Sequence, residues 1–135
     1  MNIRKRLGAM AMVAAIAGTG LVYSGSTASA ATCYGGAIDY SKPKSVGTLP
    51  QAGHYYATTS RCGDINLRSN TNRYVKVCFY KYVPSKGSFT LNYCQSDYTL
   101  TTAGKWTVIA TNVKDNTPFH YRFRSSAQST GQTAH

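Results

Sequence analysis

The sequence contains no glutamate, and its only acidic side chains are four aspartates. Glycoside hydrolysis generally needs a protonated carboxyl group paired with an ionised one, so this composition offers little for that chemistry. Two of the aspartates, Asp64 and Asp115, lie beside turns, where aspartate commonly bonds to the backbone. The chain also lacks a Gly-x-Ser-x-Gly motif, a glycine-rich phosphate loop and a Cys-x-x-Cys pair. These absences predict a protein that is not an enzyme and that holds neither a cofactor nor a metal ion.

The first thirty residues have the pattern of a secretory signal peptide. The basic run Arg4-Lys5-Arg6 precedes an apolar stretch at residues 9–22, and a run of small residues ends with Ala28-Ser29-Ala30. The apolar stretch is shorter than the roughly 20 residues that a membrane span needs. We therefore expect cleavage of a signal peptide, residues 1–30, rather than a membrane anchor. Residues 31–135 would then be a secreted, extracellular protein with no membrane segment.

The shortage of acidic residues also makes the protein strongly basic. Residues 31–135 contain 12 of the 15 basic residues and all four aspartates, which gives this part of the chain a net charge of +8. Such a charge attracts polyanions over long range. His54 and His120 could supply acid–base chemistry on RNA, but small secreted ribonucleases more often use a glutamate with histidine and arginine. We therefore expect no specific nucleic-acid partner.

All four cysteines lie in residues 31–135, and an even number in an exported domain predicts two disulfides. Four cysteines allow three pairings. We favour Cys33–Cys62, which would fasten the N-terminal arm, and Cys78–Cys94, which would close a hairpin that contains Pro84 and Gly87. Each bridge would stabilise the fold by about 3–4 kcal/mol through its effect on the unfolded chain.

Strand-forming Tyr, Thr and Val are abundant in residues 31–135, whereas strong helix formers are scarce. Between clusters of turn residues the sequence predicts strands at His54–Ser60, Asp64–Arg68, Arg73–Val83, Phe89–Cys94, Tyr98–Thr101, Lys105–Thr111 and Phe119–Arg124. The expected fold is an all-β, antiparallel β-sandwich, jelly-roll-like, with two disulfides. We expect an N-terminal arm at residues 31–51, the β-sandwich core at 52–124, and a polar, frayed C-terminal tail at 125–135.

Apolar and polar residues alternate along these strands, as a half-buried strand requires. The predicted core residues are Val75, Val77, Phe79, Trp106, Val108, Tyr121 and Phe123. The residues between them would face the other way and form the candidate ligand-binding set: Tyr74, Lys76, Tyr80, Tyr82, His120, Arg122 and Arg124, with Arg68 as a neighbour. The alternative is that these tyrosines pack beneath another layer, because tyrosine is often half-buried in strands.

The segments Thr59–Arg68, Val77–Phe79 and Trp106–Asp115 carry a family resemblance. They resemble small secreted proteins and end-modules of soil actinobacteria, and the likeness covers most of residues 33–125. The resemblance implies export and a β-sandwich. It implies no activity and brings no catalytic residue to this chain.

Aromatic rings flanked by cationic groups suit sugar rings and anionic polymers. The expected function is therefore non-enzymatic binding of an extracellular ligand, an anionic or neutral cell-wall polymer or polysaccharide. The alternative is inhibition of a secreted hydrolase, a protease or an amylase. Small disulfide-stabilised proteins suit that role because a fixed loop loses little entropy on docking. The loops to consider are Arg68–Arg73 and Lys81–Lys86.

Overall fold

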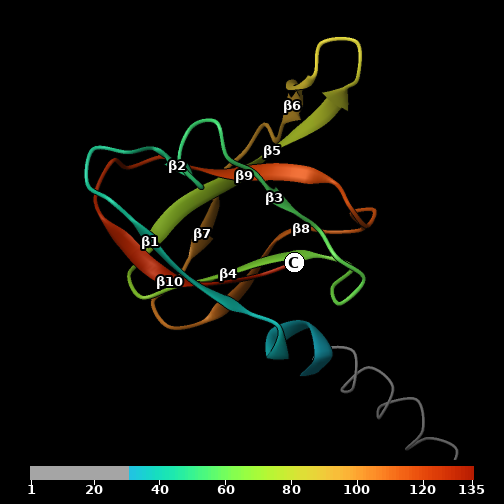
Figure 1. Cartoon of the computed structure of the whole chain (residues 1–135). Coiled ribbons are helices and arrows are strands. Elements are labelled where there is room, and N and C mark those ends of the chain that lie inside the picture. Colours follow the sequence, from blue (N-terminus) through green and yellow to red (C-terminus); the bar gives the residue numbers. More distant parts are fainter. Residues whose placement is uncertain (1–30) are drawn as a thin grey trace, which may run out of the picture.

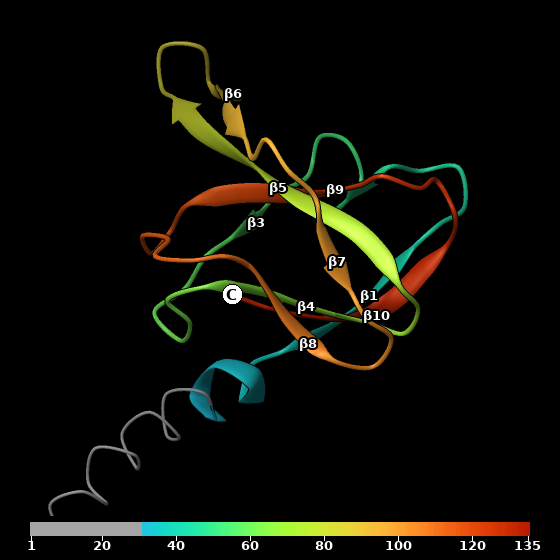
Figure 2. The ribbon, with the colours of Figure 1, turned by 180° about the vertical axis from the view of Figure 1, so that it is seen from behind.

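The computed structural model describes residues 31–135, which form two antiparallel sheets packed face to face (Figure 1). Sheet A contains, in spatial order, β1 (Ile38–Lys42), β10 (Ser129–Ala134), β4 (Ile65–Ser69) and β8 (Trp106–Ala110). Sheet B contains β2 (Thr48–Leu49), β9 (Pro118–Phe123), β5 (Arg73–Val83) and β6 (Ser88–Cys94) in spatial order, with β3 (Tyr56–Ala57) also paired to β9 and β7 (Thr99–Thr101) to β5. Figure 2 shows the same two layers from behind.

The all-β, antiparallel sandwich with two disulfides is therefore confirmed, while the jelly-roll-like connectivity stays a prediction. The disulfides join Cys33 to Cys62 and Cys78 to Cys94, as the sequence predicted. The predicted signal peptide at residues 1–30 lies outside the described residues. Within residues 31–135, no helix has the length and apolar character needed to cross a membrane.

The C-terminal segment is a structural strand, so the prediction of a frayed tail at 125–135 is wrong. Strand β10 lies between β1 and β4 in sheet A, and Ser129, Thr133 and Ala134 are buried. The backbone of this segment is also held from outside the strand, because Lys42 Nζ donates to the carbonyl oxygen of Ala127 at 2.7 Å. The sequence does not predict β10 because its residues are small and mostly polar. They are buried because β10 lies between β1 and β4.

The N-terminal arm at residues 31–51 is likewise part of the sandwich rather than an appendage. Strand β1 pairs with β10 over five residues, and β2 pairs with β9. The sheets thus extend on both sides of the predicted core at 52–124.

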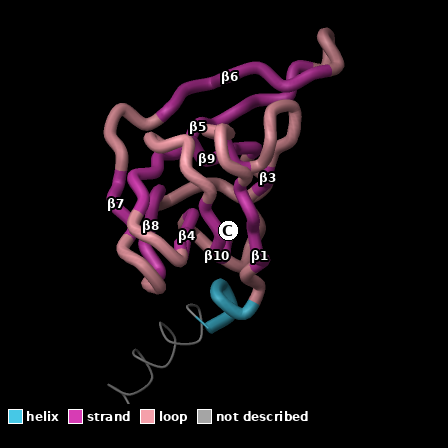
Figure 3. The backbone as a smooth tube through the Cα atoms, turned by 90° about the vertical axis from the view of Figure 1, so that its left-hand side faces the viewer, coloured by secondary structure: helices cyan, strands magenta, loops and turns pink. Residues whose placement is uncertain are grey.

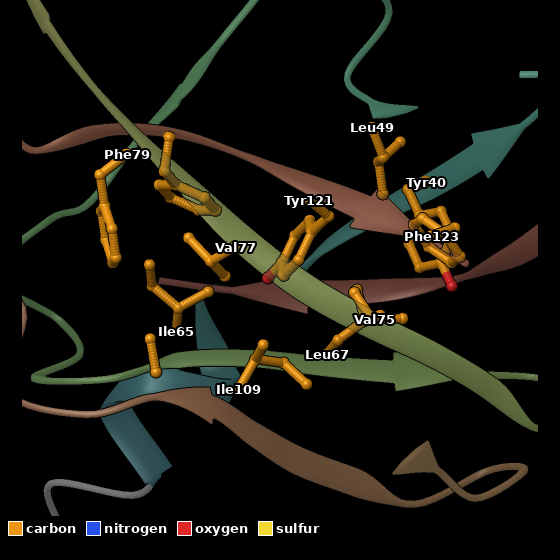
Figure 4. Packing of buried hydrophobic residues seen from close by; sticks show 12 residues of the cluster. Tyr40, Leu49, Ile65, Leu67, Val75, Val77, Phe79, Ile109, Tyr121 and Phe123 are labelled. Atoms are coloured by element: carbon orange, nitrogen blue, oxygen red, sulfur yellow. The ribbon is translucent and has the colours of Figure 1, made fainter. Parts of the chain in front are cut away.

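The core lies between the sheets, and Figure 4 shows its side chains gathered there from both layers. Five of the predicted core residues are buried: Val75, Val77, Phe79, Tyr121 and Phe123. The Tyr121 hydroxyl reaches from sheet B to sheet A, where it donates to the carbonyl oxygen of Asn66 at 3.1 Å and shares a hydrogen bond with Thr133 Oγ1 at 2.6 Å. Buried hydroxyls require such partners, so these bonds fix how the two sheets align.

The predicted core register of β8 is wrong. Val108 is 41% exposed, whereas Ile109 and Ala110 are both buried. The cause is a register shift against β4, which interrupts the alternation of sides between Val108 and Ala110. Trp106 is partly buried, outside the main core, in a small cluster around the Cys33–Cys62 disulfide, and its ring stacks on Tyr34 with the centroids 4.6 Å apart.

Adjacent alanine substitutions test the register of β8. Ile109→Ala should lower the free energy of unfolding by about 2–4 kcal/mol, because it removes buried apolar volume. Val108→Ala should change it by less than about 1 kcal/mol, because most surface changes are small. Urea unfolding followed by Trp106 fluorescence measures both. A larger loss for Val108→Ala than for Ile109→Ala would restore the register predicted from the sequence.

Acid should destabilise the fold through His135. Burial lowers the pKa of His135 to about 4, from an ordinary value of 6.5, and burial also lowers the pKa of His120. A histidine whose pKa is lowered by folding takes up a proton on unfolding, so its contribution is complete above pH 6.5 and is lost as the pH falls towards 4. Denaturant unfolding at a series of pH values should show this loss, and His135→Gln should reduce it. An unchanged pH dependence in that variant would contradict the assignment.

Candidate binding face

The outer surface of sheet B carries all but one of the sequence-predicted binding residues. The inward direction of Val75, Val77 and Tyr121 forces the intervening residues of β5 and β9 outward. The register places Lys76 directly opposite Arg122 and Cys78 opposite His120. We call this surface the outer face of sheet B. It includes Tyr74, Lys76, Tyr80, Tyr82, His120, Arg122 and, just beyond the end of β9, Arg124.

One half of this face is cationic. Lys76 and Arg122 are cross-strand neighbours with the same charge, an arrangement that destabilises an isolated sheet. The Arg124 guanidinium lies 3.7 Å from the centre of the Tyr74 ring, and Lys76 Nζ lies 4.7 Å from the centre of the Tyr98 ring. Strands β5, β6, β7 and β9 contain no aspartate, so none of these strands supplies a carboxylate to neutralise the cations. Cation–π contacts hold two of the cations over aromatic rings and leave their charge intact.

The other half of the face is aromatic. The Tyr80 ring lies 4.7 Å from Tyr55 and 4.9 Å from His120, measured between centroids. The series continues along the hairpin, where Phe89 lies 4.8 Å from Tyr55 and 5.3 Å from Tyr82. The Cys78–Cys94 disulfide lies between the two halves and joins β5 to β6 across a directly opposed pair. The two halves thus lie on the same side of sheet B, on either side of this bridge, whose Cys78 is buried.

His120 belongs to the aromatic half and not to the charged half. It is buried, and burial together with the charge of Arg122 lowers the pKa of its imidazole. Its Nε2 lies 3.5 Å from the Tyr80 hydroxyl. Burial and the neighbouring charge therefore favour the neutral imidazole, and the cations of the predicted polar stripe are Arg122 and Arg124.

Arg68 does not neighbour these residues, which corrects the sequence-based grouping. It lies on β4 in sheet A, where the register pairs it with Gln132 on one side and Trp106 on the other. The alternation of residues along a strand does not reveal which sheet the strand joins, so the sequence could not show that Arg68 and Arg122 lie in different sheets. Tyr55 and Tyr98 also contribute rings to the outer face of sheet B, although neither was among the predicted binding residues. Each lies just before a strand, where the alternation of apolar and polar residues does not predict the direction of a side chain.

Comparisons with known proteins add no relative: no family model matches the chain, and neither do any curated protein or solved structure. Within residues 31–135, no three His, Cys, Asp or Glu side chains come together in a group that could hold a metal ion. The outer face of sheet B offers positive charges held over aromatic rings, and groups of this kind attract anions and pack against flat rings.

Proposed function

We propose that residues 31–135 form a secreted, non-enzymatic binding domain for an anionic extracellular polymer, such as an anionic cell-wall polysaccharide. The observation that carries the proposal is the direct opposition of Lys76 and Arg122, with Arg124 further along the same face. Two disulfides fit an oxidising, extracellular setting. The cleaved signal peptide predicted at residues 1–30 supports the same location.

A polyanion explains why like charges stand side by side. Their repulsion opposes folding in the free protein and becomes an attraction for negative groups that bind between them. Aromatic rings beneath Lys76 and Arg124 hold these side chains close to the sheet, which reduces the entropy that they lose on binding. The same rings offer flat apolar surfaces on which sugar rings can pack.

Specificity would come from the combination of charge and rings. The net charge of +8 on residues 31–135 causes weak retention on any polyanion, through released counterions and screened attraction. A face with rings at fixed positions beside the cations favours a polymer that has sugar faces as well as charge. We therefore expect a carbohydrate-based polyanion to bind more tightly than a plain polyanion of equal charge density.

The salt dependence of binding tests this proposal. In Lys76→Ala/Arg122→Ala, affinity for a teichoic acid or a sulfated glycan should fall about tenfold or more, and the slope of log affinity against log salt should become shallower by about 2. Tyr74→Ala should lower affinity and leave that slope nearly unchanged, since ring packing is not ionic. Calorimetric titration at several salt concentrations measures both quantities.

A charge-matched variant provides the control. Lys105→Ala/Lys114→Ala removes two exposed charges outside the outer face of sheet B and should weaken binding far less. Equal losses in the two double variants, together with wild-type binding by Tyr74→Ala, would show a diffuse basic surface and would refute the proposed site.

A second candidate function is inhibition of a secreted hydrolase, and the β5–β6 hairpin favours it. The hairpin extends beyond the body of the sandwich (Figures 1 and 3), and the Cys78–Cys94 disulfide braces its base. It exposes large side chains, with Tyr82 51%, Leu91 55% and Tyr93 55% accessible. Its tip contains the predicted loop Lys81–Lys86. The other predicted loop, Arg68–Arg73, is instead hydrogen-bonded to the body of the domain, because Asn70 N donates to Thr130 O and Ala103 N donates to Asn72 Oδ1.

Titration of secreted proteases and amylases tests the second candidate. If the hairpin inhibits such an enzyme, Tyr82→Ala/Leu91→Ala should raise the inhibition constant at least tenfold, because exposed anchors dominate docking energy. Ile38→Ala/Leu100→Ala, which truncates exposed apolar residues elsewhere, should have little effect. Absence of inhibition across both enzyme classes would remove this candidate and leave polymer binding as the proposed function.

A further inference from the structure

A row of side chains crosses the outer surface of sheet A from edge to edge. The register places Asp39 of β1 opposite Gln132 of β10, Gln132 opposite Arg68 of β4, and Arg68 opposite Trp106 of β8. Each strand of the sheet thus contributes one side chain to the row. At the spacing of neighbouring strands the row is about 14 Å long. Inward-facing Leu67 and Thr133 beside it show that these four side chains lie on the side away from the core.

Hydrogen bonds fix the polar groups of this row and leave others open. Gln132 Nε2 donates to Asp39 Oδ1 at 3.1 Å, and Arg68 Nε donates to the carbonyl oxygen of Gly104 at 3.0 Å. Within the described residues, Asp39 Oδ2, Gln132 Oε1 and the two terminal nitrogens of Arg68 make no hydrogen bond. The row therefore presents two acceptors and a pair of donors on side chains that are already oriented, which limits the entropy lost when a ligand binds.

Three members of the row lie in a groove that is lined mainly by polar side chains. Asp39, Arg68 and Gln132 line the groove together with Asn70 and Thr130, and Asn70 Nδ2 donates to Thr130 Oγ1 at 2.9 Å. At the β8 end, Trp106 lies beside Arg68 and stacks on Tyr34. The groove thus offers polar groups, and the aromatic pair lies just beyond its β8 end.

We propose that this groove binds an uncharged, extended glycan chain of the β-1,4-linked type. Sugar hydroxyls both donate and accept hydrogen bonds, and the row supplies acceptor oxygens on Asp39 and Gln132 and donor nitrogens on Arg68. Asp39 and Arg68 carry opposite charges, so the row is electrically balanced and does not select for an anion, unlike the outer face of sheet B. A straight row on one sheet suits an extended chain better than a coiled one, and the spacing of its side chains is close to the length of one sugar. Trp106 and Tyr34 offer an apolar surface at the end of the row.

This site is independent of the proposed polyanion function, because it lies on the opposite sheet and uses different residues. Two binding surfaces on one domain would let it join two polymers. Failure of either function leaves the other intact, and the two separate by their response to salt, since only the polyanion contacts release counterions.

Calorimetric titration of the protein with β-1,4-linked hexamers of glucose, xylose and N-acetylglucosamine tests the site. At least one hexamer should bind with a dissociation constant below about 1 mM, and its affinity should change less than about twofold as salt rises from about 0.05 to 0.5 M. Arg68→Ala and Asp39→Ala should each weaken binding about tenfold. Lys76→Ala/Arg122→Ala should bind the same hexamer as the wild type does.

Thermal unfolding of each variant shows whether it is folded, and Gln132→Ala provides a further single change in the same row, expected to weaken binding at least threefold. No binding by any of the three hexamers would overturn the proposal. Wild-type affinity in folded Arg68→Ala and Asp39→Ala, or an equal loss in the sheet B double variant, would also overturn it.

Discussion

The buried hydroxyl of Tyr121 is the contact on which the arrangement of the molecule depends. Its ring lies in the core on β9, and its oxygen bonds to groups of β4 and β10 in the other sheet. Burial strongly raises the pKa of this phenol, so it stays protonated and remains available as a donor. A polar group that has left water must find partners, and among residues 31–135 the partners of this hydroxyl lie across the sandwich. The two sheets are thereby held in one alignment.

That inward direction determines what the surface presents. With Tyr121 inside, His120 and Arg122 must point outward on β9, where they meet Cys78 and Lys76 of β5. The same rule operates in sheet A, where inward Thr133 and Leu67 set Gln132 and Arg68 on the outside. One molecule therefore has two outer faces of different character. One is cationic and aromatic, and the other is charge-balanced and polar with an aromatic end.

Sequence reasoning succeeded where alternation is regular. Strand β5 was predicted with its observed bounds, β9 within one residue at each end, and the disulfides were paired correctly. It failed where neighbouring strands decide the outcome. Residues 129–134 are too polar to signal a strand, and a register shift disturbed the pattern of β8. The grouping of Arg68 with Arg122 failed because sheet membership is a property of strand pairing over long sequence distances. The sequence also does not single out the groove residue Gln132, because it lies in β10, which is too polar to be predicted as a strand.

Backbone NMR of the labelled protein, titrated with a glycerol-phosphate teichoic acid oligomer, shows directly whether the outer face of sheet B binds a polyanion. We expect chemical-shift changes concentrated at residues 74–78 of β5, at residues 120–123 of β9 and at Arg124 just beyond β9, and these changes should weaken as salt is added. The outer residues of sheet A should stay unchanged in that titration. Shifts confined to the β5–β6 hairpin tip, or spread evenly over all lysine and arginine positions, would contradict the claim that the outer face of sheet B is a binding site.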